Sequence, residues 1–226
     1  MQEESQNYQN NKLIRSFGRI KSRRLSDHKN SLIENLLPNY EIKNFDISAQ
    51  KNSLEIGFGF GDFTFQKAKE NPDKFFLGSE PHLNGVVNLL AKLEVEPLQN
   101  LKISREDVRI LLASFAPKTF DEVFILFPDP WPKSKHFKRR LISTKFLDEI
   151  LSPKMKDGAK LVIATDHDSY KTWILSELLR SKKFSWQAKS KTDWQIFPKD
   201  WVETKYQKKA AAEGRTSVIF NLIHNA

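Results

Sequence analysis

Cysteine is absent from the 226-residue sequence, and so are long apolar runs. Without cysteine there is no disulfide framework, no cysteine-type zinc site and no cysteine nucleophile. No apolar run approaches the roughly 20 residues that span a bilayer, and the opening MQEESQNYQN lacks the basic and apolar regions of a signal peptide. We therefore expect a cytoplasmic protein with no membrane partner.

Metal-binding patterns are missing as well. The five histidines do not fall at metal-ligand spacings, and most stand singly near expected strand ends, turns or the terminus. Surface or capping roles fit them better than ligation. We expect no metal, and no obligatory protein partner is evident from the sequence.

Positive charge exceeds negative charge, with 37 Lys and Arg against 28 Asp and Glu and a formal net charge of +9. Such a surface attracts polyanions, nucleic acid above all, although a basic balance can also serve solubility alone. Six of the basic residues lie in residues 15–29, where few apolar residues accompany them. An extended phosphate-contacting arm and an ordinary solvated segment both fit this stretch. We expect residues 1–30 to form a mobile basic arm and residues 31–226 a single domain.

From residue 52 onward, apolar runs of strand length alternate with helical patterns. This alternation is typical of a mostly parallel sheet with helices on both faces. We expect a doubly wound, Rossmann-like α/β fold with seven strands, of which the last is antiparallel. The strands are expected at residues 53–59, 74–80, 101–107, 121–128, 159–166, 184–190 and 216–223, with a long polar loop between the last two.

Helices are expected before and between these strands. A short one should cover residues 31–38, with Ser31 as N-cap, Glu34 completing a capping box and Pro38 ending it. The others should act as right-handed crossovers or cover the sheet. They are expected at residues 62–71, 82–94, 108–115, 138–152 and 168–183.

The first strand leads into a glycine-rich turn that can bind a ligand. Glu55 is followed by Gly57, Gly59 and Gly61, and glycine lets the backbone approach a ligand closely. A tight turn without a ligand is the alternative. Asp62 stands where a nicotinamide fingerprint would have its last glycine, which disfavours a pyrophosphate there. A cofactor without phosphates fits better.

Acidic residues end the next strands, at the edge where ligands bind in open α/β sheets. Glu80 lies about 20 residues beyond the glycines, where acids bind ribose hydroxyls. Asp107 can accept from an adenine amine, and Glu55 can brace the glycine turn or bind the amino-acid end of the ligand. Each acid alone could instead cap a helix or be solvated. Together they predict a nucleoside cofactor.

The most specific motif is FPDPWPK at residues 127–133. Its three prolines restrict the backbone, so Asp129 and Trp131 should have little freedom at the mouth of the site. An indole can stack on a purine, and the basic cluster that follows can contact phosphates. The alternative is a core tryptophan with prolines that only end a strand. The basic cluster comprises Lys133, Lys135, Lys138, Arg139 and Arg140.

These motifs resemble those of bacterial tRNA (guanine-N7-)-methyltransferases of the TrmB type, which are class I S-adenosylmethionine-dependent enzymes. The matching segments are LEIGFGFGD, GSEPH, FPDPWPKSKHFKRR, ATD and TKYQ, between residues 54 and 207, and the basic segment at 15–24 is also similar. The resemblance implies transfer of a methyl group from S-adenosylmethionine to N7 of a guanosine in the tRNA variable loop.

The resemblance also implies roles for individual residues. Cofactor contacts fall on Glu55, Glu80, Asp107 and Asp129, and the glycine turn adds Gly57 and Gly59. Asp129 is in addition the candidate catalytic residue. Contacts to the tRNA substrate fall on Lys133, Asp166, Thr204, Lys205, Tyr206 and Gln207.

Two segments depart from the family pattern. Gln207 stands where the family usually has Glu, and Ser79 and Pro81 stand where Ile and Val are more usual. An amide keeps one acceptor and adds a donor, so a contact to the guanine edge can survive in altered form. Two other readings stay open: an α/β dehydrogenase, which Asp62 disfavours, and an RNA-binding module with a decayed cofactor pocket.

Overall fold

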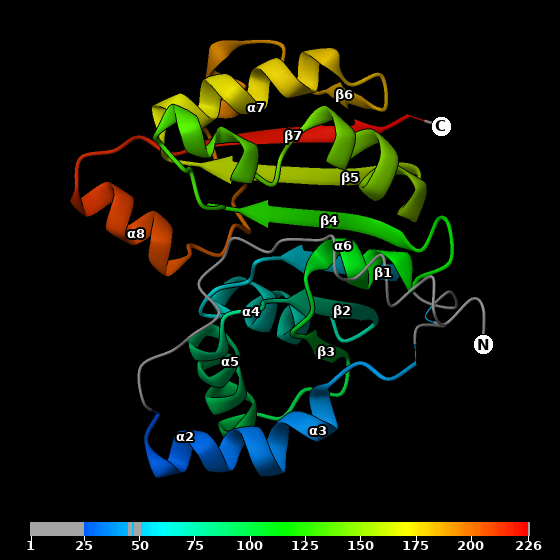
Figure 1. Cartoon of the computed structure of the whole chain (residues 1–226), viewed down its shortest axis with the longest axis vertical. Helices are drawn as coiled ribbons and strands as arrows, with labels where there is room; N and C mark the ends of the chain where they lie inside the picture. The colour runs from blue at the N-terminus through cyan, green and yellow to red at the C-terminus, as the bar shows by residue number, and fades with distance from the viewer. Residues whose placement is uncertain (1–24, 45–46, 48–50, 226) are drawn as a thin grey trace.

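The computed structural model describes residues 25–44, 47 and 51–225. Their centre is a seven-stranded sheet in the order β3-β2-β1-β4-β5-β7-β6 (Figure 1). The first five strands are parallel, and β7 runs antiparallel to both of its neighbours. The expected doubly wound sheet with its antiparallel last strand is therefore confirmed. The strands are β1 (Lys51–Ile56), β2 (Lys74–Ser79), β3 (Leu101–Ser104), β4 (Phe120–Leu126), β5 (Met155–Thr165), β6 (Phe184–Trp186) and β7 (Val218–His224).

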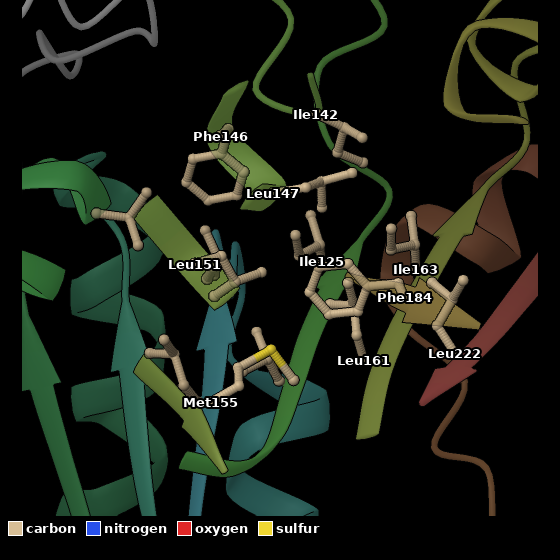
Figure 2. Close-up of a cluster of buried hydrophobic side chains, with 14 of the residues drawn as sticks. Ile125, Ile142, Phe146, Leu147, Leu151, Met155, Leu161, Ile163, Phe184 and Leu222 are labelled. Atoms are coloured by element: carbon tan, nitrogen blue, oxygen red, sulfur yellow. The ribbon is translucent and has the colours of Figure 1, made fainter. Parts of the chain in front are cut away.

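Helices pack on both faces of the sheet because alternate strand residues are apolar on each side. One face buries Leu54, Ile125 and Ile163 against α6 and α7. Figure 2 shows the part of this core where Phe146 and Leu151 meet the sheet. The helical segments are α2 (Asp27–Ser31), η1 (Leu32–Leu36), α3 (Leu37–Tyr40), α4 (Asp62–Glu70), α5 (Leu83–Val95), α6 (Val108–Ala113), η2 (Ser134–Arg139), η3 (Phe146–Leu151), η4 (Ser152–Lys154), α7 (Asp168–Arg180), η5 (Lys191–Trp194) and α8 (Lys205–Ala212).

The other face carries two smaller clusters. Phe76 packs with the buried residues of α5 and of the first helical segment. Phe63 of α4 packs against Leu126 and Ala164 at the ends of β4 and β5. Trp201 closes this second cluster, with its ring 5.2 Å from that of Phe63. The segment before α8 is thereby fixed to the sheet.

The first helical segment differs from the prediction at both ends. It runs from Asp27 to Tyr40 as α2, η1 and α3, and Ser26 rather than Ser31 is the N-cap residue. Ser31 has helical backbone angles and Pro38 lies in the first turn of α3, so the capping box and the proline stop are both wrong. Proline offers no N–H to the preceding turn, and the chain widens into a π-helical turn just before it. The expected boundary at residues 30 and 31 stays a prediction, and Arg15 to Arg24 lie outside the described residues.

Two later segments also differ. The helix expected at 138–152 is interrupted: η2 ends at Arg139, and helical structure resumes only at residue 144. The long polar loop expected before the last strand contains η5 and α8. Among the described residues no helix is long and apolar enough to cross a membrane, and no cluster of His, Asp or Glu could hold a metal ion.

Candidate active site

A cavity of about 1280 Å³ opens at the carboxyl ends of β1, β2 and β4. Typical small-ligand pockets measure roughly 300–1,000 Å³, so this one has room for a second occupant beside a cofactor. Trp131 and the cavity-facing side of α5 form further parts of its wall. Six of the predicted site residues line it: Gly57, Gly59, Glu80, Asp107, Asp129 and Tyr206.

The glycine turn and Glu80 hold each other in place. Gly57 and Gly59 have φ angles of +73° and +56°, which disfavour residues with a Cβ. One Glu80 carboxylate oxygen accepts from the Gly59 N–H at 2.9 Å, and the other accepts from the His82 N–H at 2.8 Å. Burial raises the pKa of Glu80, and these two N–H groups oppose the rise. Each oxygen keeps another lone pair that can accept from ribose hydroxyls, so the turn fits a nucleoside.

Two helices approach this turn closely. A Cβ on Gly85 of α5 would lie 2.3 Å from the Gly59 carbonyl oxygen, so only glycine fits there. On the opposite side, a Cβ on Gly59 would lie 2.7 Å from the ring of Tyr206 in α8. These two close approaches fix the position of the glycine turn at the floor of the cavity.

Glu55 lies beneath the turn and not on the cavity wall. Its side chain is buried, and the Thr64 hydroxyl donates to its carboxylate. Burial raises the pKa of Glu55 to about 7, and the hydrogen bond from Thr64 limits the rise. Of the two roles expected for Glu55, this position supports bracing of the turn.

Asp107 lines the cavity and also begins a helix. It is the N-cap of α6 and accepts from the Arg109 backbone N–H at 3.0 Å. The Arg109 guanidinium forms an ion pair with the same carboxylate at 2.7 Å. The capping role that an isolated acid usually has is present, and a contact to adenine stays a prediction.

The FPDPWPK segment forms a constrained loop at the mouth of the cavity. Phe127 and Trp131 have φ angles of +53° and +41°, which cost about 1–3 kcal/mol each for residues other than glycine. Between them, the exposed carboxylate of Asp129 lines the cavity. The protein around it raises its pKa, and the nearby His82 opposes this.

Trp131 is half-buried and lines the cavity, so it is not a core residue. Its ring is held edge-on by His136 at 5.7 Å, and the Arg139 guanidinium lies 4.8 Å from the ring centre. These contacts leave the indole at the cavity wall, where the sequence predicts a surface for a purine.

The expected substrate residues are only partly brought together. Tyr206 lines the cavity, whereas Lys133 is exposed outside it. Asp166 forms an ion pair with Arg215 at 3.1 Å. The remaining three begin α8: Thr204 caps it by accepting from the Gln207 N–H, Lys205 lies over the Phe60 ring, and the Gln207 side-chain oxygen accepts from the Trp201 indole N–H.

Arg140 corrects one part of the sequence interpretation. The sequence predicts a phosphate contact for Arg140, but this residue is 5% exposed and donates to backbone and side-chain oxygens of the protein. A phosphate contact by Arg140 is therefore wrong. All three of Lys138, Arg139 and Arg140 border the cavity, but the guanidinium of Arg140 is bound to the protein itself.

Sequence reasoning also missed three residues on the cavity wall. His82 precedes α5 and lies near Asp129. Asn84 and Asn88 stand one helical turn apart on α5 and both line the cavity. Their i, i+4 spacing is a signal that could have placed them on one helix face.

Known structures share this architecture. The 16S rRNA methyltransferase KamB has a TM-score of 0.54 and 14% identity, and the match covers 91% of this chain and 97% of that one. An antibiotic-related methyltransferase has a TM-score of 0.53 and 17% identity over the same shares. At these identities the likeness establishes the fold alone.

Sequence comparison establishes the family. A family model described as a putative methyltransferase matches residues 49–220. The tRNA (guanine-N(7)-)-methyltransferase of Hyphomonas neptunium is 40% identical, over 87% of this chain and 93% of the relative. That of Agrobacterium fabrum is 36% identical, over 92% and 94%. With the glycine turn, Glu80 and Asp129 around one cavity, the chain belongs to the tRNA (guanine-N(7)-)-methyltransferase family.

Proposed function

We propose that this chain methylates N7 of a guanosine in the tRNA variable loop, with S-adenosylmethionine as the methyl donor. The observation that carries the proposal is that Glu80 and Asp129 face the same cavity from either side of the glycine turn. Relatives that cover nearly the whole chain are named tRNA (guanine-N(7)-)-methyltransferases. We place the reaction in the cytoplasm and invoke no metal.

The cofactor would be held by the residues at the ends of the first three strands. Glu80 is oriented by two backbone N–H groups, so its free lone pairs can bind the ribose hydroxyls without rearrangement. In this proposal Asp107, which lines the cavity, accepts from the adenine amine, and Glu55 supports the turn from below. When bound, S-adenosylmethionine supplies an electrophilic methyl group on a sulfonium.

The remaining part of the cavity suits the base. Guanine N7 carries an exposed lone pair, and methylation there removes no proton from the attacked atom, so no general base is required. Trp131 offers an aromatic face for the purine, and Tyr206 lies near the carboxylates of Glu80 and Asp129. Asp129 can stabilise the positive charge that forms on the methylated purine. Rate then comes from alignment and charge stabilisation.

The direct test is incubation with unmodified tRNA and labelled S-adenosylmethionine, followed by nuclease digestion and nucleoside analysis. We expect 7-methylguanosine, and none from a tRNA whose variable-loop guanosine is replaced by adenosine. Label in another nucleoside, or equal label in both tRNAs, would overturn the assignment. Titration with S-adenosylmethionine and with NAD separates the three alternatives. A methyltransferase would bind S-adenosylmethionine, a dehydrogenase would bind NAD, and a decayed pocket would bind neither.

A further inference from the structure

Arg140 is a buried cation whose guanidinium joins two parts of the structure. Its Nε donates to the Pro130 carbonyl oxygen at 2.9 Å. Its two Nη atoms donate to Ser169 at the start of α7, one to the carbonyl oxygen at 3.3 Å and one to the hydroxyl at 3.0 Å. The planar fork of arginine allows these bonds at the same time, which an ammonium group cannot reproduce.

Aromatic rings surround the guanidinium. Its carbon lies 3.9 Å from the ring centre of Phe137, 4.9 Å from that of Tyr170 and 5.1 Å from that of Trp173. Within the described part of the chain, Arg140 forms no ion pair. The charge is therefore held by ring faces and by neutral oxygens, which fix its direction as well as its position.

The loop that Arg140 contacts needs such a support. Phe127 and Trp131 both have left-handed backbone angles, and the prolines at 128, 130 and 132 have no N–H to donate. The Phe127 N–H donates to the Ala164 carbonyl and fixes the start of the loop. The bond from Arg140 to the Pro130 carbonyl lies between Asp129 and Trp131, the two residues that the loop presents to the cavity.

We propose that Arg140 is a positioning residue for methyl transfer. It holds the Pro130 carbonyl against α7 and thereby fixes the directions of Asp129 and Trp131. The inference rests on the proposed function for its catalytic consequence, but the support of the loop is a separate physical claim. Misplacement of a reacting group by about 1 Å costs on the order of 100-fold in rate, so loss of this support should act mainly on turnover.

Arg140→Lys tests the claim because it keeps the charge and most of the length but loses the fork. We expect single-turnover methyl transfer to fall about 100-fold. The Kd for S-adenosylmethionine should change much less, because Arg140 supports Asp129 but not the glycine turn or Glu80. Ser169→Ala removes one anchor of the guanidinium and leaves the buried cation in place, so it should give a smaller loss of the same kind. The matched control is Thr172→Ala, which removes an exposed hydroxyl from the same helix without touching Arg140 and should retain near-normal transfer.

A spectroscopic signal separates positioning from general damage. In protein labelled with 5-fluorotryptophan, the Trp131 fluorine resonance is assigned by its loss in Trp131→Phe. In Arg140→Lys it should shift or broaden, while the resonances of Trp186 and Trp194, which pack on Phe220, stay in place. Near-normal transfer by Arg140→Lys, or an unmoved Trp131 resonance in that variant, would overturn the proposal. A general loss of chemical-shift dispersion in Ser169→Ala would also overturn it, because the damage would then not be confined to the loop. If the wild-type chain fails to methylate tRNA, the proposed function fails, and the Trp131 resonance still reports whether Arg140 supports the loop.

Discussion

Glu55, which is buried under the glycine turn, makes the stability of the folded chain depend on pH. Its ordinary pKa is 4.5 and burial raises it to about 7, so the folded state favours the neutral acid. The neutral Glu55 side chain contributes its full stabilisation of the folded state below pH 4.5. This contribution is lost as the pH rises through 7, because folding must then bury a charge. At roughly 1.4 kcal/mol per pKa unit, the change in the free energy of unfolding is about 3 kcal/mol.

Glu55→Gln should remove this dependence because the amide is neutral at every pH. We expect urea unfolding curves of the wild type to shift to lower midpoints between pH 5 and 8 relative to those of Glu55→Gln. The two proteins would differ least near pH 5. Parallel curves for both across this range would show that Glu55 does not titrate in it.

Asp129 should control the rate of transfer at low pH. The surrounding protein partly shields its carboxylate from water and so raises its pKa, and Asp129 loses its charge at a higher pH than an ordinary aspartate. The single-turnover rate should therefore fall as the pH drops through that value, because a neutral carboxyl cannot stabilise the charge on the purine. Asp129→Asn keeps the size of the side chain and should be slow at every pH with little slope. A variant that transfers at the wild-type rate would remove Asp129 from the mechanism.

At the scale of elements, the contact between α5 and the glycine turn is the tightest part of the site. In Gly85→Ala the new Cβ would meet the Gly59 carbonyl oxygen at 2.3 Å, and backbone cannot move aside as a flexible side chain can. We expect a loss of about 1–3 kcal/mol in stability and weaker binding of S-adenosylmethionine by calorimetry. The control is Val95→Ala, because Val95 lies at the end of the same helix and is 85% exposed. This substitution should change neither stability nor cofactor binding. Unchanged binding by Gly85→Ala would show that the turn is not part of the cofactor site.

The parallel strands could be predicted because each is a short segment containing apolar residues that is followed by a glycine or an acid. The segments missed carry weaker patterns. The sequence KYQKKAAA of α8 has a weak apolar pattern and falls in the predicted polar loop, although Thr204 ahead of it is a good N-cap. Helix propensities predict that the helix ends at Pro38. They do not predict the π-helical turn that accommodates this proline within the helical segment.

In the candidate site, too, some side chains could be placed from the sequence and others could not. Residues at strand ends could be placed because topology brings strand ends together, and Glu80 and Asp129 do line one cavity. Arg140 stands next to Arg139 in the sequence, yet Arg140 is buried against Phe137 whereas the half-buried Arg139 lies over the Trp131 ring. Arg139 ends the short 3₁₀ segment η2 and Arg140 follows it with an extended backbone, and no charge pattern distinguishes the two.

At the scale of the whole molecule, the net charge of +9 matters through its distribution. Lys138 is exposed on the cavity rim, whereas Lys182 is exposed beyond the far end of α7. Binding of tRNA should weaken steeply with salt, and Lys138→Ala should lower the slope of log K against log salt by about 1. Lys182→Ala should leave the slope unchanged. Equal slopes for the two variants, measured by filter binding over a salt series, would mean that Lys138 contacts no phosphate.

The segment from residue 187 to 217 joins β6 and β7, which are neighbours paired through Trp186 and Leu222. Its two ends are thus held together by the sheet whatever the intervening chain does, and loops closed in this way tolerate replacement. It nevertheless supplies Tyr206 to the cavity. Residues in this segment can therefore change which nucleic acid the cavity admits without disturbing the cofactor-binding residues at the ends of β1 and β2.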